Sequence, residues 1–172
     1  MNKFKIKKKA QVWVETVIYT LIFLTIIAGV LAFVTPAIYK QRDKSAVQQS
    51  IGLMNNIDAT VSEIKLYPGN SRPLQLKISR GLLTIDGGNN TVKFLVDNSA
   101  FPYGEAGQNI TEGNIVITTV PRGNKFNIVM VLNYSQSNNI TYNGADVEHV
   151  FSASPTTYNL VVKNTGKSID FF

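Results

Sequence analysis

The chain has no cysteine and a single histidine among its 172 residues. Without cysteine it can form no disulfide framework, no thiolate metal site and no cysteine nucleophile. The histidine, His149, has Asp146 and Glu148 beside it, but the ligand spacing that is typical of zinc sites is absent. We therefore interpret His149 as a residue on the surface of a strand rather than as a metal ligand or a catalytic base.

Motifs for catalysis and nucleotide binding are also missing. The sequence has no P-loop, no dinucleotide fingerprint, no G-x-S-x-G elbow and no paired-carboxylate motif. Asp86 with Asn89 and Asn90 offers oxygen ligands, but this stretch lacks the acidic density of a calcium loop. We expect a protein that is not an enzyme, with no catalytic residue, no metal and no cofactor.

Positive charge is scarce outside the N-terminus. The chain has 17 basic and 11 acidic residues, and without the five lysines of its first ten positions 12 basic residues face 11 acidic ones. No broad basic face is then left for nucleic acid, and we expect no such partner. The five are Lys3, Lys5, Lys7, Lys8 and Lys9.

A long apolar run follows the lysines. It extends from Val12 to Val34, about 23 residues, which as a helix span roughly 35 Å and exceed a hydrocarbon core of about 30 Å. Secretory signals have a shorter run, of about 7 to 15 residues, with a small-residue cleavage site after it. The lysines before the run outnumber Lys40, Arg42 and Lys44 after it, so we expect the N-terminus in the cytoplasm and the rest of the chain outside.

One carboxylate, Glu15, lies inside this run. An ionised acid costs about 2.5 to 3.5 kcal/mol at the centre of a membrane helix and less near the interface. In a plain membrane anchor Glu15 would be a snorkelling carboxylate with no role.

The residues around Glu15 resemble the N-terminus of type IV pilin precursors. Lys7, Lys8 and Lys9 precede a small residue, Ala10, and then come Gln11, Glu15 and the apolar helix. The resemblance implies that a prepilin peptidase cuts between Ala10 and Gln11, which makes Glu15 the fifth residue of the mature chain, where the family keeps a glutamate. It also implies that the α-amino group of Gln11 meets Glu15 of a neighbouring subunit and sets the register of a filament.

Gln11 and Glu15 are also similar to the archaeal, class III variant of this signal, Q-x-S-x-E-x-x-x-L. Trp13 stands where that pattern has serine, and Tyr19 stands where it has leucine. The partners that the resemblance implies are copies of the chain itself, the peptidase, an assembly ATPase and a membrane platform protein.

The rest of the helix changes character at Pro36. Because proline lacks an amide proton and disfavours helix at the residue before it, we expect a kink or break near Thr35. We divide the expected helix 11–66 into a transmembrane or filament-core part, 11–35, and an amphipathic part, 37–66. The apolar residues of the second part recur every three or four positions, as on one helical face. They are Val47, Ile51, Met54, Ile57, Val61 and Ile64.

Residues 67–172 favour an antiparallel β domain. Seven short alternating or β-branched runs, separated by turn residues, predict strands near 73–79, 82–86, 91–97, 114–120, 125–134, 146–154 and 157–164. The segment 101–113, rich in glycine, is expected to be an exposed loop. The fold class is thus α+β, a long apolar helix followed by a β-sheet or sandwich head.

Four asparagines begin N-x-S/T sequons and are candidate glycosylation sites of an exported chain. They are Asn89, Asn109, Asn133 and Asn139.

The interpretation that accounts for most of these features is the subunit of a pilus-like surface filament with a leader at residues 1–10. Two alternatives stay open. One is an uncleaved, single-pass anchor carrying a surface β domain. The other is a pseudopilin or minor pilin of a secretion or DNA-uptake filament.

Overall fold

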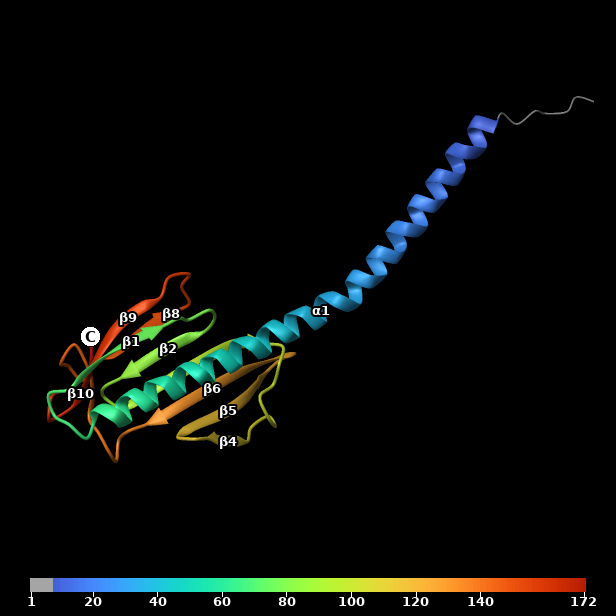
Figure 1. Cartoon of the computed structure of the whole chain (residues 1–172). Coiled ribbons are helices and arrows are strands. Elements are labelled where there is room, and N and C mark those ends of the chain that lie inside the picture. Colours follow the sequence, from blue (N-terminus) through green and yellow to red (C-terminus); the bar gives the residue numbers. More distant parts are fainter. Residues whose placement is uncertain (1–7) are drawn as a thin grey trace, which may run out of the picture. The chain divides into compact units, whose positions relative to one another are not determined.

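The computed structural model describes residues 8–172, with side chains from Val12 onward, so Lys7 and the residues before it lie outside the described part. One long helix, α1 (Lys8–Ile64), precedes ten strands that form two sheets (Figure 1). All strand pairs but one are antiparallel. The predicted α+β class is therefore confirmed. The chain divides into two units, Met1–Tyr39 and Lys40–Phe172, the second of which we call the head.

The N-terminal unit holds the apolar part of α1. Each side chain from Val12 to Tyr39 is exposed, so this part of the helix has no buried stripe. We expected a kink or break near Thr35; the helix continues across Pro36, so there is no break. The physical reason is that proline removes a single amide donor, while turns on either side keep their bonds. The Thr35 hydroxyl, for example, donates to the Leu31 carbonyl at 2.6 Å.

The head begins with the amphipathic part of α1, and its predicted apolar face is confirmed. All six residues of this face are buried, with exposed fractions between 0% and 6%. Burying an aliphatic side chain of this size stabilises a fold by roughly 1.5 to 3 kcal/mol, so this face is the main apolar contact of α1. We call these six residues the helix stripe: Val47, Ile51, Met54, Ile57, Val61 and Ile64.

The two sheets of the head differ in size. The four-stranded sheet has the order β1-β9-β10-β7, with β1 (Ser71–Leu76), β9 (Tyr158–Asn164), β10 (Ile169–Phe171) and β7 (Ile140–Tyr142). The six-stranded sheet has the order β4-β5-β6-β3-β2-β8. Its strands are β4 (Asn109–Glu112), β5 (Ile115–Arg122), β6 (Lys125–Asn133), β3 (Thr91–Ser99), β2 (Leu82–Asp86) and β8 (Glu148–Ser152).

Each of the seven predicted runs contains a strand, and three further strands were missed. The missed strands are β4, β7 and β10, of three or four residues each. The expectation that 101–113 is entirely loop is wrong at its end, because β4 pairs with β5 from Asn109 to Glu112. Runs this short carry too few residues for an alternating pattern to be recognised.

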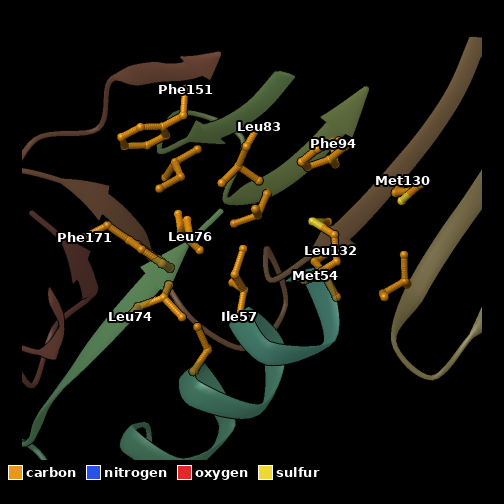
Figure 2. Packing of buried hydrophobic residues seen from close by; sticks show 14 of the residues in the cluster. Met54, Ile57, Leu74, Leu76, Leu83, Phe94, Met130, Leu132, Phe151 and Phe171 are labelled. Carbon is orange, nitrogen blue, oxygen red and sulfur yellow. The ribbon is translucent and has the colours of Figure 1, made fainter. Parts of the chain in front are cut away.

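The core of the head lies between the helix stripe and the inward faces of both sheets. Figure 2 shows Met54 and Ile57 of α1 directed toward side chains from several strands, among them Leu76 and Leu132. All the residues labelled there belong to one buried apolar cluster. The two sheets therefore share one core with the helix.

Carboxylates of α1 add directional contacts at both ends of this interface. Asp43, only 6% exposed, pairs with Arg80 and accepts the Ala100 amide at 2.6 Å. Arg80 also donates to the carbonyls of Asp97 and Asn98. Further along the helix, Asp58 accepts the Tyr134 hydroxyl at 2.9 Å and the Asn114 side-chain amide at 2.8 Å.

The turn that presents Arg80 depends on the next residue, Gly81. Its φ is 99°, a conformation that side chains disfavour, and a Cβ atom there would clash with the Leu95 carbonyl oxygen. Glycine thus lets the backbone approach β3 closely enough for Arg80 to reach Asp43.

We predict that Asp43→Asn destabilises the head by about 2 to 3 kcal/mol. Removing one partner of a buried ion pair costs about 3 to 5 kcal/mol, and the cost is lower here because the Arg80 side chain is 34% exposed to water. Denaturant unfolding of the full chain in detergent, followed by near-ultraviolet circular dichroism, measures the change. Asp97→Asn, which removes an exposed acid near Arg80, is the control and should change stability little. Equal stability of both variants would contradict the prediction.

Candidate functional site

The apolar part of α1 is the most unusual surface of the molecule. Large side chains are exposed along its whole length, up to 83% for Phe33. Over the described residues, α1 is the one helix long and apolar enough to cross a membrane. A buried core helix can have the same composition, but no residue in the most apolar stretch of α1 is buried. This segment is therefore an N-terminal apolar helix of the kind that serves as a membrane span or a signal sequence.

Glu15 is the acidic group of this segment, and its surroundings are sparse. Within residues 12–172, whose side chains the structure describes, the one group that donates to it is the Tyr19 hydroxyl, at 3.3 Å from Glu15 Oε1. That distance is longer than is usual for a hydroxyl donor, which lies at about 2.5 to 3.0 Å. Tyr19 replaces the leucine of the archaeal pattern, so this departure supplies Glu15 with a weak partner from its own helix.

Three hydroxyl groups of the apolar segment are satisfied locally. Thr16, Thr20 and Thr25 each donate a hydroxyl hydrogen bond to the carbonyl four residues earlier, at 2.8 to 2.9 Å. Such bonds remove the cost of placing a hydroxyl in an apolar medium. Among the side chains that the structure describes, from Val12 onward, Tyr19 is the one donor to Glu15, and no cation pairs with it.

The predicted cleavage site lies at the start of α1. The backbones of Lys8, Lys9, Ala10 and Gln11 are helical, while their side chains lie outside the described part and Lys7 is not described at all. The assignment of Ala10 and Gln11 to a processing site therefore stays a prediction.

The carboxylates of the head contrast with Glu15. Asp170, 9% exposed, accepts the Thr141 hydroxyl and the Gly144 amide, both at 2.7 Å. Asp43 and Asp58 have the partners given above, and Asp86 accepts bonds from Asn89 and Lys93. Each of these carboxylates has at least two donors within its own chain.

The four sequon asparagines are all exposed, but their amide groups differ. Asn89 donates to Asp86 at 2.8 Å, and Asn139 has a long contact to Asp146 at 3.5 Å. Asn109 and Asn133 instead accept through their side-chain oxygens, from Thr118 and Ser135 respectively. The amide nitrogens of Asn109 and Asn133 are thus less engaged and better placed for modification.

His149 lies elsewhere than expected. It points to the inner side of β8, where its ring stacks on Tyr142 at 4.0 Å between centroids with an angle of 8°. Phe151 meets the His149 ring edge to face at 4.6 Å, and Tyr158 extends the cluster. The interpretation of His149 as a simple surface residue is wrong, because β7, absent from the prediction, brings Tyr142 against it. Among the described residues, no three of the His, Cys, Asp and Glu type converge as metal ligands would.

Comparisons with known proteins add no relative. No protein-family model, no curated protein and no solved structure matches the chain.

We predict a pH-dependent contribution of Asp86 to stability. The hydrogen bond from the Asn89 side chain, with help from Lys93 and against the effect of burial, lowers the pKa of Asp86 below its ordinary value. A carboxylate with a lowered pKa stabilises the fold above its ordinary pKa of 3.8, and this contribution is lost as the pH falls through the folded value. Asp86→Asn should therefore cost about 1 to 2 kcal/mol at neutral pH and progressively less below about pH 4.

Urea unfolding of the full chain in detergent across this pH range tests the expectation. Glu105→Asn, in an exposed loop, serves as the control for removal of one negative charge. A cost of Asp86→Asn that stays constant down to the lowest pH would contradict the prediction.

Proposed function

We propose that the chain is the structural subunit of a type IV pilus-like filament at the cell surface. In this function α1 first spans the membrane, with its N-terminus in the cytoplasm, and is then packed with the helices of other copies in the filament. The head remains outside as the shell. The architecture of an exposed apolar helix followed by a β head supports this proposal.

The observation that carries the proposal is the unmet demand of Glu15. A carboxylate in an apolar medium is tolerated when it has a cation and hydrogen-bond donors, and it is costly when it has none. Glu15 has one distant hydroxyl within the described side chains, whereas Asp43, Asp58 and Asp170 of the head have two donors each. A partner from another molecule, such as the α-amino group of a processed copy, would supply Glu15 with hydrogen bonds and a positive countercharge.

Close packing of apolar helices needs small residues. Ala28, Gly29 and Ala32 lie in the middle of the segment, and a Cβ atom at Gly29 would meet nothing within 4 Å. In membranes such residues let helix backbones approach each other. This surface is free in the single chain, so it can serve contacts between copies.

The first test locates the mature chain. Intact mass and N-terminal peptides are determined for the protein from its native cells, in sheared-surface and membrane fractions. The proposal expects a chain that begins at Gln11 in the sheared fraction. An intact chain that begins at Met1 and stays in the membrane would overturn it and favour the anchored surface domain.

We predict that Glu15→Gln lowers the amount of sheared filament by at least about tenfold while the protein is still made and processed. Loss of the charge removes the attraction for a partner amine, which is worth several kcal/mol in an apolar core. Immunoblots of sheared and membrane fractions measure the ratio. Glu105→Gln, which changes an exposed head residue, should leave it unchanged. Wild-type filament yield from Glu15→Gln would refute the register role, as would a pyroglutamate in place of the free amine of Gln11.

A further inference from the structure

Five basic side chains are exposed at the end of the head where α1 enters it. Lys40, Arg42 and Lys44 are exposed on the first turns of α1 within the head. Arg122 and Lys125 are exposed at the tip of the β5–β6 hairpin, where they face each other in register. None of the five takes part in an ion pair within the described residues. We call these five residues the basic collar.

Contacts within the head place the hairpin tip and the start of its helix at the same end. The Ala100 amide bonds Asp43, and the Lys44 ammonium lies 5.9 Å from the centre of the Phe101 ring. Ser99, next to Ala100, pairs with Phe126, which directly follows Lys125. In Figure 1, β6 correspondingly starts at the end where α1 enters the head and runs alongside it.

Burial of Asp43 leaves the collar without its nearest compensating charge. In sequence, Asp43 stands between Arg42 and Lys44 and would neutralise one of them if it were exposed. Instead it is 6% exposed and bonded to Arg80, which is not part of the collar. The exposed acids of this region are Asp97 and Glu105, so the collar keeps an excess of positive charge.

The chain itself places this charge close to the outer edge of a lipid headgroup layer. Lys40 follows Val34, the last residue of the apolar run, by six positions, which is about 9 Å of helix. The polar layer on each side of a hydrocarbon core is about 5 to 8 Å thick, so Lys40 lies just past it and its long side chain can reach back toward the headgroups. Basic residues near a membrane surface are attracted to anionic lipids, whatever the sequence around them.

We propose that the basic collar binds the headgroups of anionic lipids and holds the base of the head on the membrane surface. The proposal rests on the membrane-spanning part of the proposed function, which the anchored alternative shares, and not on filament formation. The ligand is an anionic phospholipid surface, recognised by charge and not by a pocket. Five cations bound in this way would fix the orientation of the head while the helix remains in the bilayer.

Trypsin provides a direct test, because it cleaves after Arg122 and Lys125 at the exposed hairpin tip. The full chain is inserted, one copy per particle, into nanodiscs of phosphatidylcholine alone or mixed with an equal part of phosphatidylglycerol. We expect cleavage at the tip to be about tenfold slower with the anionic lipid, and salt at about 0.5 M to abolish the difference.

An internal control lies at the opposite end of the head. Lys167 is exposed in the turn between β9 and β10, where Gly166 lies beside Pro68 after the end of α1. Its cleavage should be equal in both lipids. Lys40→Gln/Arg42→Gln, which leaves both tip cleavage sites intact, should weaken the protection. The charge-matched variant Lys65→Gln/Lys163→Gln should retain it.

Three results would overturn the proposal. Equal tip cleavage in both lipids, whether the tip is open or shielded by the disc itself, would show that the collar does not bind anionic headgroups. Protection only in discs with several copies would assign the collar to contacts between copies. Failure of the chain to insert would remove the membrane premise itself, whereas absence of filaments in cells would leave the collar unaffected.

Discussion

The helix stripe is the contact on which the head depends. Its six residues fill the space between two sheets of unequal size, and without them the inward side chains of both sheets would face water. The polar contacts between helix and sheets, at Asp43, Asp58, Glu63 and the carbonyl of Ile64, are directional but few. Packing therefore supplies most of the stability, and the polar contacts set the position of α1 along the strands. Because α1 continues from the stripe into the apolar segment without a break, the same helix joins the head to whatever surrounds residues 12–39.

The acidic residues of the head and of the apolar segment differ in the partners that the chain gives them. In the head, carboxylates are matched by donors from distant parts of the chain, such as Tyr134 and Asn114 for the half-buried Asp58. Burial and the charge of Asp58 also raise the pKa of Tyr134 well above its ordinary value, so that it remains a donor at all ordinary pH values. In the apolar segment, Glu15 has one distant donor among the side chains described from Val12 onward. This contrast, in a segment suited to an apolar medium, is the reason that we propose an external partner for Glu15.

The sequence predicted those features that depend on long periodic patterns. The helix stripe and the seven longer strands were correct because each presents enough alternating or three-and-four spaced residues to define a face. The short strands β4, β7 and β10 owe their existence to neighbours that are distant in sequence, as in the parallel pairing of Ile169 with Ile140. For the same reason the stacking of His149 on Tyr142 could not be foreseen. At Pro36 the helix continues although proline disfavours helix at the residue before it, because the turns around it are stable enough to compensate.

The candidate functional residues also differ in whether the sequence alone could identify them. Glu15 and the lysines before it could be identified from sequence, because a charge inside an apolar run needs no fold to be conspicuous. The basic collar could not, because Arg122 and Lys125 come to the same end of the head as Lys40 and Arg42 only after β5 and β6 have paired and docked. Nor could the sequence show that Asp43, which lies between Arg42 and Lys44 in the chain, is buried and pairs with Arg80. The same ion pair thus has two effects: it fixes α1 on the sheets, and it leaves the exposed side chains at this end of the head with an excess of positive charge.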